Sequence, residues 1–198
     1  MKILFLISLL SFSIYASAQK RNFVLIDDIY SNWTKTYTDE KTACKTFFYS
    51  DIMDDQIIER VKDLFLEDSV FIKYNLKQDT TGAGRIIFDA KERDLIIQQL
   101  QHLNAQAWQD QIFKRSKLVP FNKIDSIQRS VNEKKLDPLV RLCYLVHIFS
   151  HPIFVRNNTI CLFYFGETDF ATKEGEFWIY KKEGSDWVKY SPLYRWVE

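Results

Sequence analysis

The sequence predicts a single α+β domain, built from an antiparallel sheet of about five to seven strands with about three helices against one face. Two observations predict this class. Apolar residues recur at helical spacing through the first two thirds of the chain, whereas the last third alternates short apolar runs with turn residues. Only five glycines and four prolines occur in 198 residues, and no linker divides them, so we expect one domain.

The N-terminus has the pattern of a secretory signal. Lys2 supplies one positive charge, residues 3–16 are almost entirely apolar, and small residues follow as Ala-Ser-Ala at 16–18. This predicts a signal peptide over residues 1–18 and a domain over residues 19–198. We therefore expect export to the periplasm or the extracellular space, with no membrane insertion after cleavage.

The charge of the expected mature chain gives no indication of a nucleic-acid partner. Without residues 1–18 it carries 26 basic and 26 acidic residues, and no basic run stands out. A nucleic-acid binder usually carries a basic excess that displaces counterions from phosphates. We therefore expect a protein or carbohydrate partner and no nucleic acid.

Several segments predict helices. A helix is expected to begin at Asp54, with Ile57, Val61 and Phe65 on one face. Asp89 is followed three residues later by Glu92, which is typical of a capping box. A third helix is expected from residue 138, because Asp-Pro precedes a run that is apolar nearly all round, and Pro152 ends it.

The remaining segments predict hairpins. One is expected over residues 69–88, and two more pair 153–155 with 159–165 and 176–181 with 186–190. Residues 160–165 and 177–180 are apolar without alternation. Strands of this kind have both faces covered, so we expect helices on one face and more of the chain, a second copy or a ligand on the other.

Aromatic residues make up 16% of the chain and gather near its C-terminus. We select Trp178, Tyr180, Trp187 and Tyr190 as candidate binding residues, because rings on an exposed sheet face stack on sugars or bury a partner's apolar side chains. The alternative is that these rings form the core, since sheets favour aromatic residues.

Three cysteines occur, and an exported protein permits a disulfide. Cys143 and Cys161 are the first choice for a bridge, because the segments that carry them are close in sequence and apolar. The alternative is that all three are small buried side chains.

Other patterns suggest chemistry only weakly, and no metal or cofactor is expected. His147 and His151 have the spacing of helical zinc pairs, but Pro152 argues against a continuous helix. Cys143 lies among apolar neighbours, which suppress thiolate formation. Acidic residues gather at 167–176 around Asp169, where we expect a solvated loop, with a weak cation site as the alternative.

The C-terminal half contains a Ser-x-Pro-Ile-Phe motif from Ser150, an Arg-Asn-Asn turn, a Tyr-Lys-Lys-x-Gly motif from Tyr180, and Trp187. With these motifs it resembles a group of uncharacterised exported bacterial proteins of unknown function. The similarity covers roughly residues 90–198. Several relatives have a Cys- and Gly-rich loop between the two hairpins, whereas residues 166–175 here contain no cysteine. The resemblance implies export and a similar fold, and it transfers no site.

The sequence therefore favours a non-catalytic exported binding protein that uses an aromatic-rich C-terminal sheet. Two alternatives remain open. One is an exported hydrolase that acts from the acidic loop near Asp169. The other is a periplasmic inhibitor or immunity-type protein, since the chain is neutral and compact.

Overall fold

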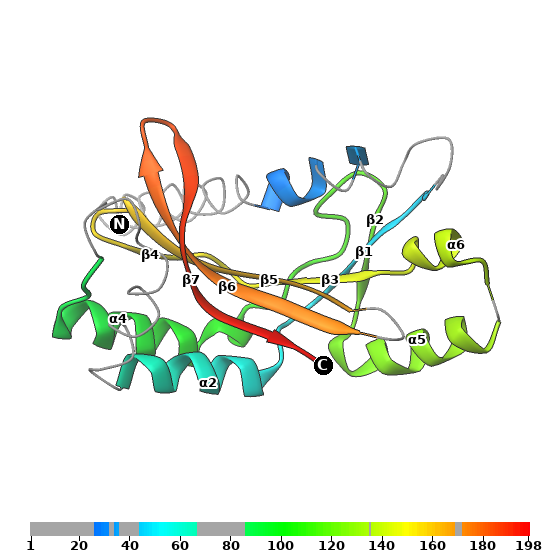
Figure 1. Cartoon of the computed structure of the whole chain (residues 1–198), viewed down its shortest axis with the longest axis horizontal. Helices are drawn as coiled ribbons and strands as arrows, with labels where there is room; N and C mark the ends of the chain where they lie inside the picture. Colours follow the sequence, from blue (N-terminus) through cyan, green and yellow to red (C-terminus); the bar gives the residue numbers. More distant parts are fainter. Residues whose placement is uncertain (1–25, 32–33, 36–43, 67–85, 135, 169–171) are drawn as a thin grey trace, which may run out of the picture.

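The computed structural model describes residues 26–31, 34–35, 44–66, 86–134, 136–168 and 172–198. They form an α+β fold in which a twisted, mixed sheet runs along the molecule with α2 and α4 side by side beneath it (Figure 1). Residues 26–31 and 34–35 are helical, and the elements that follow, including two 3₁₀ turns, are α2 (Asp55–Leu66), α4 (Ala90–Gln101), η1 (Leu103–Ala105), η2 (Phe121–Lys123), α5 (Ile124–Glu133) and α6 (Pro138–Leu142). The strands are β1 (Phe47–Ser50), β2 (Ser116–Val119), β3 (Val146–Phe149), β4 (Ile153–Val155), β5 (Ile160–Thr168), β6 (Lys173–Glu183) and β7 (Asp186–Val197).

The sheet is mixed, so the expectation of a purely antiparallel sheet is wrong. Its order is β2-β1-β3-β5-β6-β7, with β4 pairing beside β5. Strand β1 pairs in parallel with β2 and β3, while the other pairs are antiparallel. The connection from β1 to β2 contains α2 and α4, and a long helical crossover of this kind makes parallel pairing possible.

Local signals placed the first helices correctly. In α2, Ile57, Val61 and Phe65 are buried, and the Asp54 Oδ1 accepts the backbone N–H of Gln56 at 2.8 Å. The capping box of α4 is also confirmed. Glu92 N–H donates to the Asp89 carboxylate at 2.8 Å, and the Asp89 N–H donates to the Glu92 carboxylate at 3.0 Å.

The helix expected from residue 138 is much shorter than its apolar pattern predicts. Asp137 caps it as expected, but α6 ends at Leu142, and Leu139 and Val140 are 49% and 44% exposed. Most of the remaining apolar run becomes β3, which is buried on both faces. A short apolar run does not distinguish a buried helix from a buried central strand, and β-branched side chains favour the strand here.

The two C-terminal hairpins form where expected. Arg156, Asn157 and Asn158 all have positive φ in the β4–β5 turn, and Gly184 has φ +62° in the β6–β7 turn. The expected hairpin over residues 69–88 and the expected signal peptide lie, except for residues 86–88, outside the described residues.

The predicted loop at 166–175 is largely strand, because β5 continues to Thr168 and β6 begins at Lys173. Gly166 and Gly175 face each other across these strands, and the ring of Tyr164 lies over both. A Cβ at Gly175 would lie 2.1 Å from the Tyr164 hydroxyl oxygen. These glycines therefore provide space for a buried ring, not freedom for a turn.

Two clusters cover the two faces of the sheet. The aliphatic face contains Ile148, Leu162 and Ile179 and packs against α2 and α4, and α4 contributes Ile96 and Leu100 to the same cluster. The aromatic face contains mostly rings, namely Phe47, Tyr49, Trp108, Phe113, Phe149, Phe163 and Tyr180. Helical residues 26–31 and the segment 108–113 contribute to it. The expectation that both faces of 160–165 are covered is confirmed, and the cover of the aromatic face includes parts of the same chain.

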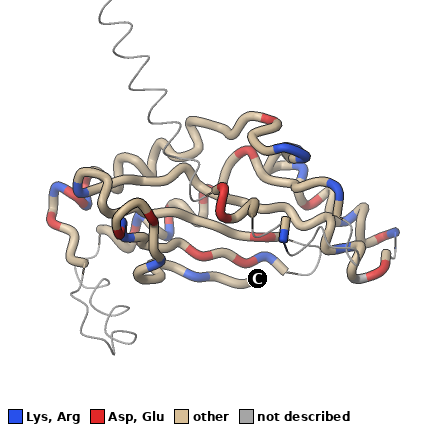
Figure 2. Tube along the Cα trace, turned by 90° about the horizontal axis from the view of Figure 1, so that it is seen from above, with Lys and Arg blue, Asp and Glu red and all other residues tan. Residues whose placement is uncertain are grey.

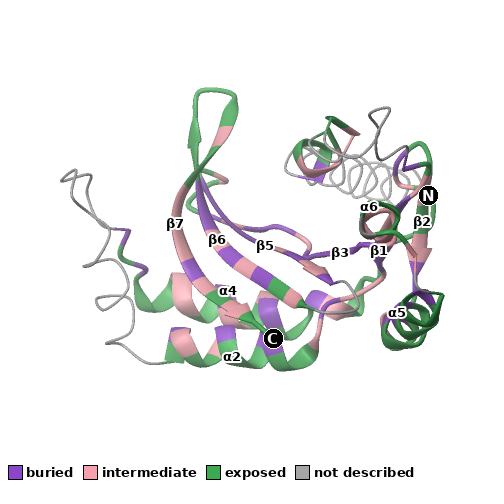
Figure 3. Cartoon of the chain, turned by 45° about the vertical axis from the view of Figure 1, so that its right-hand side comes forward, coloured by how far each residue is buried: buried purple, intermediate pink, exposed green. Residues whose placement is uncertain are grey.

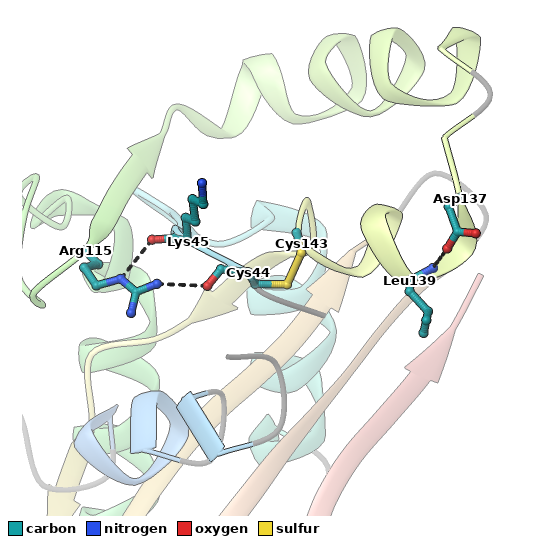
Figure 4. Close-up of a disulfide and its surroundings, with 6 residues drawn as sticks. All are labelled: Cys44, Lys45, Arg115, Asp137, Leu139 and Cys143. Carbon is teal, nitrogen blue, oxygen red and sulfur yellow. Dashed lines mark hydrogen bonds between the residues drawn. A yellow bond between two sulfur atoms is a disulfide. The ribbon is translucent and has the colours of Figure 1, made fainter. Parts of the chain in front are cut away.

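The disulfide joins Cys44 and Cys143, so the predicted Cys143–Cys161 bridge is wrong (Figure 4). The Cα atoms of the bridged pair are 5.0 Å apart, with Cys44 just before β1 and Cys143 at the end of α6. Cys161 is a free, fully buried thiol near the start of β5, between Phe154 of β4 and Tyr180 of β6. Cys143 and Cys161 are close in sequence but not in space, because the chain forms β3 and β4 between them and these strands separate the two cysteines along the sheet.

Candidate functional site

The β6–β7 hairpin projects from the body of the molecule, and its tip is exposed (Figure 3). Residues 181–186 are all exposed, whereas the part of β6 before them is mostly buried or half-buried. The hairpin carries all four candidate binding residues. At this hairpin, therefore, other parts of the chain no longer cover the aromatic face of the sheet.

Three of the four candidate residues share one side of the hairpin. Residues paired across strands project to the same side, and Tyr180 pairs with Lys189 while Lys182 pairs with Trp187. Trp178, Tyr180 and Trp187 all belong to the aromatic cluster. The ladder register shifts between Ile179 and Tyr180, and Tyr190 lies opposite this irregularity, with its ring packed against the aliphatic cluster.

Each of the two tryptophans has a lysine over its ring. The Lys189 ammonium lies 4.5 Å from the Trp178 ring centroid, and the Lys182 ammonium lies 6.0 Å from that of Trp187. Such cation–π contacts hold the ammonium near the ring while water still reaches both. We call these four side chains the Trp–Lys surface. The two lysines were not among the residues predicted from the sequence, although pairing 176–181 with 186–190 in register places them beside the rings.

The rings of this surface are held in defined orientations. Trp178 donates its indole N–H to Glu176 at 2.6 Å, and Glu176 also pairs with Arg195 at 3.1 Å. Trp187 packs against Phe154 with ring centroids 5.5 Å apart. Both tryptophans are only half-buried.

Tyr180 has a different environment from the two tryptophans. Its side chain is buried, and its ring contacts Phe163 edge-on at 6.2 Å. Burial raises the pKa of Tyr180, with smaller contributions from Cys161 and Glu176. Tyr180 therefore supports the Trp–Lys surface from below and contributes little exposed area to it.

The acidic residues expected in one loop lie on strands β5 and β6 where they are described. Asp169 lies outside the described residues. Glu167 and Glu174 are a cross-strand pair on β5 and β6, and Glu176 is engaged by Trp178 and Arg195. Within the described part of the chain, no group of three His, Cys, Asp or Glu side chains is arranged to hold a metal ion.

The histidines and cysteines are also engaged in packing. His147 is fully buried in β3, stacked between Phe47 at 4.4 Å and Phe165 at 5.9 Å. Glu167 approaches its Nδ1 at 3.2 Å, but without hydrogen-bond geometry. His151 stacks on Trp108 at 3.8 Å. Since the two histidines flank the end of a strand, they do not form the i, i+4 pair of a helix.

The cysteines of the described residues are either bridged or buried. Cys143 forms the disulfide, and burial raises the pKa of the Cys161 thiol.

None of the helices in the described ranges has the length and apolar character needed to cross a bilayer. Acidic and basic residues are both spread along the molecule (Figure 2).

Comparison with known proteins gives no match. No family model, no curated protein and no solved structure matches the chain.

Proposed function

We propose that the protein is an exported binding protein that recognises a partner through the Trp–Lys surface. The observation that carries this proposal is the pair of half-buried tryptophans, each with an ammonium group over its ring, on a projecting hairpin. Tryptophan is enriched at the energetic centres of interfaces, because it buries a large area and loses little conformational entropy.

The lysines favour a protein partner over a carbohydrate. Sugars stack on the open faces of aromatic rings, whereas Lys182 and Lys189 already lie over these faces. A partner that presents carboxylates beside apolar side chains would pair with both ammonium groups and contact the ring edges. We therefore expect an acidic, partly apolar patch on a protein.

Export is supported by the N-terminal pattern and by the disulfide. Disulfides persist in oxidising compartments and are rare in reducing ones, so the Cys44–Cys143 bridge fits a periplasmic or extracellular location. Mass spectrometry of the protein secreted by its native host tests this directly. A mature N-terminus at Gln19 is the expected result, and an intact Met1 would contradict export.

Interaction measurements with hairpin variants test the binding proposal. Trp187→Ala is expected to abolish capture of the partner from a periplasmic extract while leaving the melting temperature nearly unchanged, because Trp187 is on the projecting hairpin. Val188→Ala is the matched control, since Val188 is 42% exposed and its cross-strand partner is Lys181 on the opposite side of the hairpin.

Three results would contradict the proposal or part of it. Equal capture by the Trp187→Ala and wild-type proteins would exclude the Trp–Lys surface as the binding site. Capture lost equally in the Val188→Ala variant would indicate a general defect of the hairpin. A glycan array tested in parallel would reveal carbohydrate binding, which would contradict the preference for a protein partner.

A further inference from the structure

A cavity lies on the aliphatic face of the sheet, on the opposite side from the Trp–Lys surface. Its volume is about 140 Å³, and it lies where α2 and α5 begin beside β3, β5 and the start of β6. Apolar side chains form much of its lining, namely Ile57, Phe121, Ile124, Ile148 and Trp196. An apolar cavity of roughly 150 Å³ accommodates a molecule the size of benzene. The cavity is therefore large enough for a ligand of about six heavy atoms.

The charged groups of the lining are mainly carboxylates. Asp54 and Asp125 line the cavity together with Lys173, and the Lys173 ammonium is already paired with Asp125 Oδ1 at 2.9 Å. Glu167 also lines the cavity, but its carboxylate approaches His147 at 3.2 Å on the aromatic face. Among the described residues, recorded contacts use Oδ1 of Asp54 and Oδ1 of Asp125. One oxygen of each carboxylate remains available to a ligand.

Several N–H groups near the two helix starts already donate hydrogen bonds within the chain. A helix N-terminus binds anions through N–H groups that have no other acceptor. At α2, the N–H groups of Gln56, Ile57 and Ile58 all donate to Asp54. At η2 and α5, the N–H of Phe121 donates to Asp51, and those of Lys123 and Ile124 donate to backbone carbonyls. A carboxylate or phosphate would therefore face Asp54 and Asp125 without compensating donors from these positions.

Trp196 adds a preference for a cation. Its indole N–H donates to the Tyr164 hydroxyl at 3.1 Å, which fixes the orientation of the ring. The face of an indole ring attracts an ammonium group through its quadrupole. Apolar side chains, a fixed indole and two available carboxylate oxygens together favour a ligand with an apolar body and a cationic head.

We propose that this cavity binds a small amphiphilic ammonium compound, with the alkyl body against the isoleucines and the ammonium near Asp54 and Asp125. This inference is independent of the binding function assigned to the Trp–Lys surface. The apolar body of the ligand would displace water from the cavity, and the ammonium would remain near solvent at the carboxylates.

Titration of the mature chain with three compounds of matched shape tests this proposal. The probes are 3-methylbutylamine, 3-methylbutan-1-ol and 3-methylbutanoate, and the readout is the NMR shift of isoleucine methyl groups. The amine is expected to shift the methyl signals of Ile57, Ile124 and Ile148 in a saturable manner. The alcohol is expected to bind more weakly, and the carboxylate not at all.

Variants then locate the ammonium group. Asp54→Asn and Asp125→Asn are each expected to weaken amine binding about two- to five-fold, as for a partly exposed ion pair. Asparagine caps helices as well as aspartate, so Asp54→Asn should preserve the fold. Asp63→Asn, at an exposed position on α2, is the matched control and should not change the affinity.

Three results would overturn the proposal. Binding of the alcohol or carboxylate as tight as that of the amine would remove the charge preference. Shifts confined to the exposed Ile127 would indicate nonspecific association. Equal affinity in both aspartate variants and the wild-type protein would exclude the assigned carboxylates.

Discussion

The two faces of the sheet are covered in different ways. On the aliphatic face, branched side chains such as Leu162 are buried against α2 and α4. On the aromatic face, part of the covering chain has no regular secondary structure. Hydrogen bonds from tyrosine and tryptophan side chains hold it in place. Tyr49 donates to the Gln109 carbonyl at 2.5 Å, and Trp108 donates to the Phe149 carbonyl at 3.0 Å.

This difference shows how irregular chain can cover half of a core. The rings of Tyr49 and Trp108 bury a large area, and each donates one hydrogen bond that joins the irregular segment to the sheet, so a regular helix is not required. The disulfide adds a covalent anchor on the same face, where Cys44 and Cys143 join the aromatic cluster. The β6–β7 hairpin extends past this cover, which leaves Trp178 and Trp187 half-buried.

Removal of the disulfide, which lies on the aromatic face, is expected to cause the largest loss in the free energy of unfolding. The bridge spans a sequence separation of 99 residues. The chain-entropy model gives a loss of about 4–5 kcal/mol in the free energy of unfolding when Cys143→Ala opens a loop of this length. Urea denaturation measures it. Cys161→Ala is the control and should cost much less, so an equal loss at Cys161 would contradict this account.

A methyl group added on the aliphatic side of the sheet is expected to cause the next largest loss in the free energy of unfolding. Gly175→Ala places a Cβ 2.1 Å from the Tyr164 hydroxyl, and overpacking of this kind costs about 3 kcal/mol. Gly184→Ala meets nothing within 4 Å but has a φ of +62°, so we expect a loss of about 1 kcal/mol there. Thermal denaturation of both variants distinguishes the two causes. A smaller loss at Gly175 than at Gly184 would show that the Tyr164 ring moves aside easily.

Much of the local structure is predictable from the sequence. Asp54, the capping box at Asp89 and the turn at Asn157 act within a few residues, so their effects follow from the sequence around them. The mixed sheet is not predictable in this way. Strand β1 finds its partners β2 and β3 more than 60 residues later in the chain, and no local pattern specifies such a pairing.

The candidate site was predictable only in part. The aromatic content of 177–187 indicated the hairpin, but which rings are exposed depends on the register and on the cover from other segments. Tyr180 is buried and Tyr190 packs on the opposite face, both for reasons that come from the tertiary structure. Cys161 shows the same limit, because its burial between β4 and β6 determines that it stays unpaired.

The aromatic cover is expected to weaken at acidic pH. His151 is stacked on Trp108, and burial lowers the pKa of His151 below its usual value. The unfolded chain then takes up a proton near pH 6.5, before the folded chain does. The free energy of unfolding is therefore highest above about pH 7 and decreases as the pH falls through 6.5 toward the folded-state pKa.

Urea denaturation between pH 5 and 8 measures this dependence, and His151→Gln should remove part of its slope. The same substitution at the exposed His102 is the control. An unchanged slope in the His151→Gln variant would place the pH dependence elsewhere.

The smallest expected loss in the free energy of unfolding comes from a change in the β6–β7 hairpin, at the uncovered end of the aromatic face. Lys189→Met removes the ammonium that lies 4.5 Å from the Trp178 ring centroid, and an exposed cation–π contact contributes about 0.5 kcal/mol. Lys181→Met, at an exposed position on the other side of the hairpin, should cost less. Urea denaturation of both variants measures the difference. If Lys189→Met lowers the free energy of unfolding by several kcal/mol, the ammonium is a structural part of the hairpin. If the loss is small, the ammonium of Lys189 can leave the Trp178 ring and pair with a carboxylate of the partner at little cost in stability.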